Sequence, residues 1–331
     1  MNILTRYRET LIQKLDELLG GPPPEMGGHS PILAMCRYHV GLALADGSPR
    51  SAGGKMVRPA LCLAMYESLA TDHWGACVPV ALAIELVHRT SLIYDDIQDH
   101  SPRRNHLPTV WTTWGVDQAL NAGLALSCYA RLALSGLDHG YVETHRLLEQ
   151  TVIELCQGQY RDIEFQQRTP SLDEYLEMVR LKTGVLMGTA CEVGALVAGA
   201  DGKRAEARRF GESVGVAFQL WDDYLGVWGS EEALGKVPSD LKERKRSLPV
   251  VLAIRENSGE ICRLLKAHPE NQVVPRALKE VLDRMGIREV ACAQVVEATR
   301  MAMENLWALD LDSSWQEAFQ FLVGFVGERD V

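Results

Sequence analysis

The chain has 331 residues and a formal net charge of −10 at pH 7. This balance excludes a general affinity for nucleic acid or for anionic membranes. Apolar residues make up 47% and charged residues 24%, as in ordinary globular proteins, and a chain of this length can bury a core without crosslinks. The eight cysteines show no CxxC pair and no zinc-ligand spacing, so we expect reduced thiols and a cytoplasmic protein.

The first ten residues carry charges and contain no apolar core of a signal peptide. We also find no run of about 20 apolar residues, and therefore expect no transmembrane segment.

Helical periodicity dominates the chain. Leu11, Leu15 and Leu18 recur on one face of a first helix, which the glycine and proline run at 20–24 ends. Further helices are predicted at about 31–45, from about 58, and at 76–100, 115–135, 140–167, 172–200 and 203–228, with more after 247. Strand-like alternation is nearly absent. We therefore predict one all-α domain over residues 1–331, a bundle of roughly a dozen helices with long apolar helices at its centre.

The sharpest feature is an acidic cluster at 95–99, at the C-terminal end of a strongly apolar helix. Residues i and i+4 share a helix face, so Asp95 and Asp99 point the same way. Neighbouring carboxylates repel each other and oppose the helix dipole unless a cation neutralises them. Mg²⁺ binds in this manner, through one or two carboxylates and substrate phosphates. An exposed acidic helix end is the alternative interpretation.

A second pair, Asp222-Asp223, again follows an apolar helix. One aspartate pair is weak evidence, but two in the same setting are stronger. Basic residues occur near both clusters, and Lys55 and Arg58 stand on a glycine-flexed turn before a helix, which suits an anion. Each cation alone is typical of a solvated surface. Together they predict a polyanion bridged to Mg²⁺.

At this point the chain resembles the trans-prenyl diphosphate synthases, or polyprenyl synthetases, over roughly residues 30–255. The turn at 53–59 is similar to the family's GGKxxRP motif, and 85–99 is similar to its first aspartate-rich motif and the helix before it. Residues 158–162, 182–184, 218–223 and 235–249 also match family motifs. The resemblance implies an isoprenoid synthase fold with a central cavity, and a homodimer.

The resemblance also implies roles for individual residues. Three Mg²⁺ ions would be held by Asp95, Asp99 and Asp222. The diphosphate of an allylic prenyl substrate would be bound by Arg104, Lys182, Lys236 and Lys245, with Thr183 and Gln219 lining the same site. The diphosphate of isopentenyl diphosphate would be bound by Lys55, Arg58 and His88. In the implied reaction the allylic C–O bond breaks while the charge that develops on the leaving diphosphate is stabilised. The double bond of isopentenyl diphosphate attacks the allylic cation, and loss of a proton gives the product.

Two positions depart from the family pattern. Gly226 stands where the second motif usually has a third aspartate. Asn105 stands where the family has the second arginine of a pair, which normally helps to bind isopentenyl diphosphate. Arg103 is a candidate substitute, although it lies on a different face.

Product length is predicted from residues one turn or more before Asp95. Thr90 and Ser91 are small, and Val87 lies deeper. In this family a bulky aromatic residue one helical turn before Asp95 stops chain growth early. Because the residues here are small, the resemblance implies a longer product, geranylgeranyl diphosphate.

Two other functions remain open. A terpene cyclase on the same fold would use only the allylic diphosphate; Asn105 favours it, whereas Lys55, Arg58 and His88 favour condensation. A non-catalytic partner subunit of a second synthase is the other alternative, and the retained aspartates argue against it.

Overall fold

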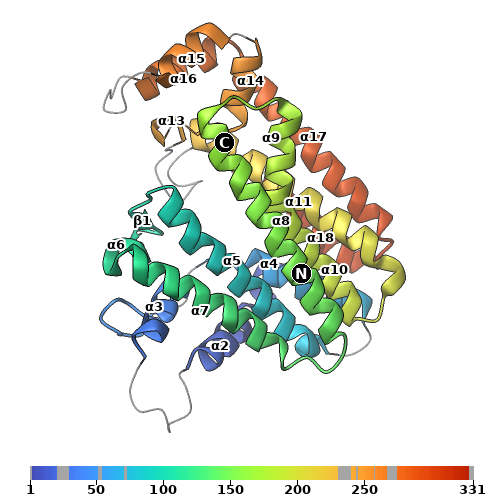
Figure 1. Cartoon of the computed structure of the whole chain (residues 1–331). Coiled ribbons are helices and arrows are strands. Elements are labelled where there is room, and N and C mark those ends of the chain that lie inside the picture. Colours follow the sequence, from blue (N-terminus) through green and yellow to red (C-terminus); the bar gives the residue numbers. More distant parts are fainter. Residues whose placement is uncertain are drawn as a thin grey trace. The chain divides into compact units, whose positions relative to one another are not determined.

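The computed structural model describes residues 2–20, 30–50, 54–70, 73–229, 240–243, 245–256, 258–266 and 274–327. Its elements are α1 (Ile3–Arg6), α2 (Arg8–Leu18), α3 (Pro31–Val40), α4 (Val57–Leu69), η2 (Trp74–Cys77), α5 (Val78–Gln98), β1 (Arg103–Arg104), β2 (Leu107–Pro108), α6 (Val110–Trp114), α7 (Val116–Leu134), α8 (Tyr141–Gln167), α9 (Leu172–Val179), η3 (Arg180–Gly184), α10 (Val185–Val197), η4 (Asp201–Lys203), α11 (Arg204–Trp228), α13 (Asp240–Glu243), α14 (Leu248–Glu256), α15 (Ser258–Lys266), α16 (Val274–Arg284), α17 (Ile287–Ala308) and α18 (Ser313–Gly327) (Figure 1). The predicted all-α class is confirmed.

The chain folds into two compact units. Unit 1 comprises Met1–Val152, Thr189–Arg208 and Leu311–Ala318, and unit 2 comprises Ile153–Gly188, Arg209–Asp310 and Phe319–Val331. The first aspartate cluster belongs to unit 1 and the second to unit 2. The single domain expected from the sequence stays a prediction.

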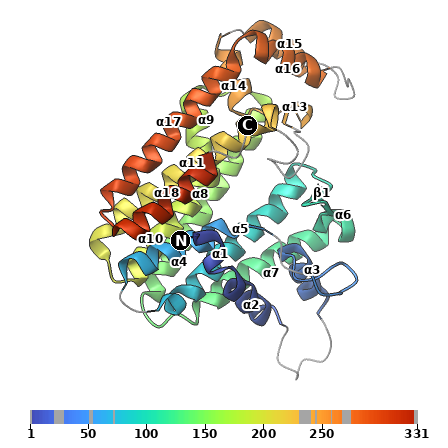
Figure 2. The same ribbon diagram turned by 180° about the vertical axis from the view of Figure 1, so that it is seen from behind.

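Unit 1 is built around α5, which packs along α7 and also touches α2, α3 and α4 (Figures 1 and 2). The two long helices approach closely where Gly123 of α7 faces the ring of Tyr94. A Cβ at position 123 would lie only 2.9 Å from the ring Cζ, so a larger residue would not fit there without a shift. The sequence Val80–Ile84 is buried throughout, so α5 is a core helix over its first half. Its last turns become progressively more polar and carry the aspartates.

One segment that includes this helix is more apolar than we expected from the sequence. The segment Trp74–Gln98 is long and apolar enough, by composition, to cross a membrane, although we expected no such segment. In the structure 61% of its apolar window is buried inside the protein, as in the core helix of a globular unit.

Unit 2 has its own hydrophobic core, formed by residues of α8, α9, α11, α13, α14, α15, α16 and α17. At its centre the rings of Trp221 and Tyr224 stack with their centroids 5.1 Å apart. Leu225, Leu252 and Leu282 are buried around them. This core holds the C-terminal half of α11, and therefore fixes the place of the second aspartate pair.

Three local details differ from the sequence prediction. The helix expected at 31–45 ends at Val40, because Gly41 adopts φ +87° and terminates it in a left-handed cap. The helix expected at 172–200 is interrupted by one π-helical turn, η3, at the Lys182-Thr183 pair. A short antiparallel hairpin, β1–β2, follows the first aspartate cluster.

Candidate active site

The acidic end of α5 has the geometry expected from the sequence. The backbone N–H of Asp99 donates to the carbonyl of Asp95 at 2.8 Å, so the two residues stand one helical turn apart. Both side chains are half-buried. Their oxygen ligands suit a hard cation such as Mg²⁺.

Asp96, between them, has a different role. It is 2% exposed, and both Nε and Nη2 of Arg104 lie 2.9 Å from its Oδ1. Burial raises the pKa of Asp96, while the Arg104 guanidinium opposes that rise. Arg104 Nη2 also lies 3.8 Å from Asp95 Oδ2. The β1–β2 hairpin therefore places Arg104, a predicted diphosphate-binding residue, next to Asp95, a predicted metal ligand. The contact between Arg104 and Asp96 that holds it there was not predicted from the sequence.

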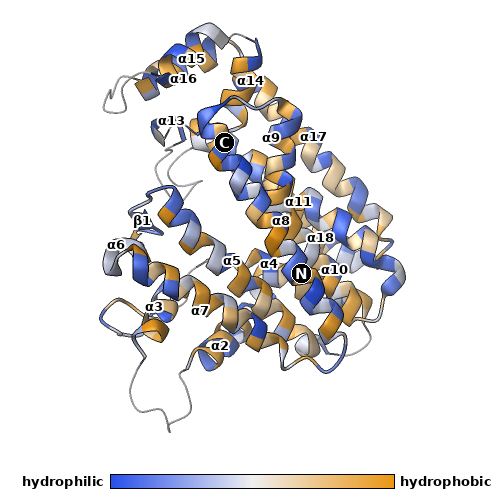
Figure 3. Cartoon of the chain, in the orientation of Figure 1, coloured by the Kyte–Doolittle hydropathy of each residue, from blue (hydrophilic) through white to orange (hydrophobic). Residues whose placement is uncertain are grey.

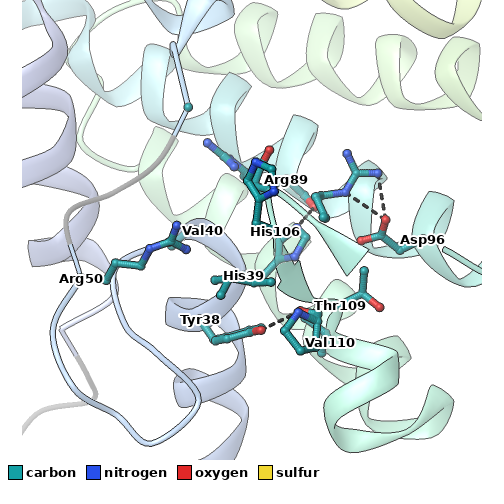
Figure 4. A pocket seen from close by; sticks show the side chains of 15 residues that line it. Tyr38, His39, Val40, Arg50, Arg89, Asp96, His106, Thr109 and Val110 are labelled. Atoms are coloured by element: carbon teal, nitrogen blue, oxygen red, sulfur yellow. Dashed lines mark hydrogen bonds and ion pairs between the residues drawn. The ribbon is translucent and has the colours of Figure 1, made fainter. Parts of the chain in front are cut away.

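A cavity of about 280 Å³ adjoins this ion pair (Figure 4). Its charged lining residues are Arg50, Arg89, Arg104 and Asp96, and its polar lining includes His39, Asn105 and His106. Three arginines face one aspartate, in a protein whose overall charge is strongly negative. Such a local excess of positive charge is suited to an anionic ligand.

The turn before α4 holds further predicted anion ligands, and its Gly54 also lines the cavity. Arg58 Nη1 lies 3.2 Å from Nε2 of His88 on α5, so a neutral His88 accepts a hydrogen bond from Arg58. Burial, assisted by the nearby Arg58 charge, holds the pKa of His88 well below its ordinary value. Lys55 is exposed on the same turn. These three predicted residues thus lie on two neighbouring elements of unit 1.

In unit 2 the second cluster is tied into a hydrogen-bond network. The hydroxyl of Thr183 donates to Gln219 Oε1 at 3.0 Å, and Gln219 Nε2 donates to Asp223 Oδ1 at 2.8 Å. Asp223 Oδ2 accepts from the hydroxyl of Tyr175 and from the backbone N–H of Leu248 at 2.8 Å. Asp223 is buried and accepts from three donors, which fixes its carboxylate, whereas Asp222 beside it is half-buried.

The π-helical turn η3 positions the predicted Lys182. Its Nζ lies 2.5 Å from Oδ2 of Asp162 on α8. The backbones approach so closely here that a Cβ on Gly158 of α8 would lie 2.6 Å from the amide nitrogen of Lys182. Single π turns are rare and occur frequently at functional sites.

The remaining predicted residues are placed less fully. Lys236 lies outside the described residues. Lys245 is exposed, and its backbone N–H donates to the carbonyl of Asp240 at 3.0 Å. The predicted chain-length residues Val87, Thr90 and Ser91 are half-buried on α5. The Thr90 hydroxyl is buried and has no hydrogen-bond partner among the described residues.

The ligand chemistry fits Mg²⁺ held jointly with a substrate. Within the described ranges, no three histidine, cysteine or acidic side chains converge as a metal cage. Mg²⁺ ordinarily keeps several waters and binds through one or two carboxylates and substrate phosphates. Asp95 and Asp99 offer this kind of partial site.

Comparison with known proteins shows the family of the chain. Residues 48–285 match the family model described as Polyprenyl synthetase. The chain is 33% identical over its full length, and 98% of the relative's, to a short chain isoprenyl diphosphate synthase of Methanothermobacter thermautotrophicus. It is 42% identical to a (2E,6E)-farnesyl diphosphate synthase of Mycobacterium bovis, over 69% of this chain and 64% of that protein's length. It superposes on a polyprenyl synthetase from Streptomyces coelicolor with a TM-score of 0.87 and 33% identity, covering 98% of both chains.

The chain therefore belongs to the polyprenyl synthetase family, as its motifs predicted. The isoprenoid synthase fold expected from the resemblance is confirmed by the solved relatives. The names of the relatives agree with the expected prenyl-elongating activity.

Proposed function

We propose that this protein condenses isopentenyl diphosphate with an allylic prenyl diphosphate, head to tail, releasing diphosphate. The observation that carries the proposal is the junction in unit 1 between carboxylates and arginines. Asp95 and Asp99 end α5 beside Arg104, and Arg104 lines the arginine-rich cavity. In this proposal a site for a divalent cation and a site for an anion share one wall.

The residues of unit 1 act on both substrates in this proposal. Lys55, Arg58 and His88 bind the diphosphate of isopentenyl diphosphate and hold its double bond in place, which removes orientational freedom before reaction. Arg104 exchanges part of its contact with Asp96 for the allylic diphosphate. Asp95 and Asp99 are the ligands for Mg²⁺, which when bound neutralises diphosphate charge as the C–O bond weakens.

The residues of unit 2 act on the allylic diphosphate. Lys182 donates to it from the π turn, and Asp162 fixes the position of the ammonium group. Thr183 and Gln219 line the same site, and their side chains are held in place by the hydrogen-bond chain that ends on Asp223. Asp222 provides a further ligand for Mg²⁺. Lys236 and Lys245 complete the set in the proposal. We expect three Mg²⁺ ions per site, following the family resemblance.

The deciding experiment supplies radiolabelled isopentenyl diphosphate with dimethylallyl, geranyl or farnesyl diphosphate and Mg²⁺. Incorporation of the label into a longer prenyl diphosphate supports the proposal. A terpene cyclase would leave the label unincorporated while consuming the allylic substrate. A non-catalytic partner subunit would turn over neither substrate as a purified chain.

We propose geranylgeranyl diphosphate as the product, because Thr90 and Ser91 on α5 are small. Relatives named as farnesyl and as geranylgeranyl diphosphate synthases both resemble the chain, so product analysis is needed. Ser91→Phe should shorten the product. Unchanged chain length would remove this position from the set of length determinants.

We also propose a cytoplasmic homodimer. Exposed apolar residues recur along α7 at intervals of four or eight residues, at Val116, Leu120, Leu124 and Leu132. Several stretches of α7 are coloured as hydrophobic in Figure 3. Leu124 is 60% exposed, and a row of this kind is typical of a surface covered by another helix. Light scattering after gel filtration measures the assembly; Leu124→Glu should yield monomer, and a parent protein already monomeric would contradict the proposal.

A further inference from the structure

Asn105 has a structural reason for departing from the family pattern. Strands β1 and β2 are joined by the two residues Asn105 and His106, which have φ values of +48° and +66°. A two-residue hairpin turn with both central residues at positive φ strongly favours asparagine or glycine. Asparagine enters the left-handed region more readily than longer side chains do. The turn therefore gains stability from Asn105, and the cavity loses the cation that the family has there.

Arg103, the substitute considered from the sequence, does not replace that cation. Its side chain is exposed, and its Nη2 donates to the backbone carbonyl of His106 at 2.6 Å. It is not among the residues lining the cavity. Successive residues of a strand point to opposite faces, and Arg104 takes the inner face.

Arg89 of α5 does line the cavity (Figure 4). Asn105 is another of its lining residues. Its Nε donates to Glu85 Oε1 at 2.7 Å, and only 8% of the Arg89 side chain is exposed. Its Nη2 reaches the turn before α4, where a Cβ on Gly54 would lie 2.9 Å away. Gly54 also has φ +98°, so this position requires glycine for its backbone and for the approach of the guanidinium. Glu85 and Gly54 thus hold the Arg89 guanidinium in a fixed orientation at the cavity wall.

This guanidinium stands next to the other predicted ligands of the same diphosphate. Arg58 begins the helix that follows Gly54, and His88 precedes Arg89 on α5. Burial, with the Arg89 charge adding to its effect, lowers the pKa of Arg58 to about 10, although Glu85 opposes the change. Two arginines this close repel each other, and a bound dianion would relieve the repulsion.

We propose that Arg89 supplies the cation that Asn105 lacks, and that it binds the diphosphate of isopentenyl diphosphate in this chain. The inference rests on the proposed condensation. It assigns a substrate-binding role to a residue that the sequence motifs leave without one. The positive charge has moved from the hairpin to the adjacent helix, and the binding site keeps its charge.

The test measures KM for isopentenyl diphosphate and for the allylic substrate separately. Arg89→Asn should raise KM for isopentenyl diphosphate by about tenfold to hundredfold, the range for losing a charge-assisted hydrogen bond, and change the allylic KM by less than about threefold. Adding Asn105→Arg to Arg89→Asn should restore most of the affinity, because it returns the cation to the hairpin. Arg103→Asn is the matched control and should leave both constants unchanged.

Glu85 would lose its partner in Arg89→Asn, and a buried unpaired charge is destabilising. The double variant Glu85→Gln with Arg89→Gln leaves no such charge, so it keeps the test valid where the single variant fails to fold. We expect the same rise in KM and the same rescue by Asn105→Arg. A merely structural Arg89 would show lower thermal stability with no selective change in KM and no rescue.

Two results overturn the inference. One is an Arg89 variant, folded and active, whose KM for isopentenyl diphosphate is unchanged. The other is a selective rise in KM with Arg103→Asn in place of Arg89→Asn. Failure of the proposed function is recognised separately, because the parent protein would then incorporate no labelled isopentenyl diphosphate.

Discussion

The carboxylate of Asp240 occupies the space beside Gly226 that any side chain at position 226 would need. A Cβ built on Gly226 would lie 2.6 Å from the Cγ of Asp240, well inside contact distance. Gly226 belongs to α11 and Asp240 begins α13, and Asp240 is 8% exposed. The space next to Gly226, where the second motif usually carries a third aspartate, is therefore filled by a carboxylate from further along the chain.

This relationship predicts that Gly226 does not tolerate a side chain. Gly226→Ala should lower the free energy of unfolding by about 1–3 kcal/mol, since the added methyl group must displace Asp240. Urea denaturation followed by circular dichroism measures the change. Gly324→Ala in α18 is the matched control, because a Cβ there meets nothing within 4 Å and alanine favours helix. Equal effects of the two substitutions would contradict the steric explanation.

The buried Tyr175 should be needed to keep Asp223 in place. Tyr175→Phe removes one of three donors to the Asp223 carboxylate, and we expect a loss of about 1–3 kcal/mol in the free energy of unfolding. Thermal denaturation of purified protein measures it. Tyr160→Phe is the control, because Tyr160 is 69% exposed. If both variants melt alike, the Tyr175 hydroxyl contributes nothing to the network.

Lys182 should matter for the allylic substrate alone. Lys182→Ala should lower kcat/KM for the allylic diphosphate by about tenfold to hundredfold and leave KM for isopentenyl diphosphate nearly unchanged. Its ion pair with Asp162 is partly exposed, so little stability is expected to be lost. Lys279→Ala, which breaks a comparable pair with Asp283, is the control for a general charge effect. A matching loss of activity in that variant would remove Lys182 from the site.

Motif spacing was sufficient to predict the local parts of the site. Asp95 and Asp99 stand one turn apart because helix periodicity alone places them so. The helices at 76–100 and 115–135 were predicted to within two residues at each end, because their apolar runs are long.

The parts that sequence reasoning missed all depend on tertiary approach. Asp96 meets Arg104 only because a hairpin folds back onto α5. No motif assigns a role to Arg89, and the orientation of its side chain is set by Glu85 on its own helix and by the space that Gly54 leaves. A signal for the hairpin did exist, since an asparagine before a histidine between two short extended pairs suits a turn with positive φ.

The pH dependence of stability should be governed in part by His39, whose Nε2–H donates to the carbonyl of Arg89 at 2.8 Å. Burial, with the Arg89 guanidinium adding to its effect, lowers the pKa of His39 from 6.5 to about 3, so the folded protein keeps the ring neutral. The unfolded chain takes up the proton first as pH falls. This stabilisation is therefore complete above about pH 6.5, and is lost progressively as pH falls toward 3.

His39→Gln should flatten the fall in stability between about pH 6.5 and pH 5, because glutamine retains a donor but takes up no proton. The parent should lose up to about 2 kcal/mol more than this variant over that range. Chemical denaturation at several pH values measures both proteins. His139→Gln, at an exposed position, is the control and should follow the parent curve. A parent curve identical to that of His39→Gln would mean that the ring is protonated in the folded protein, and that the cavity beside Arg89 is more hydrated than its burial indicates.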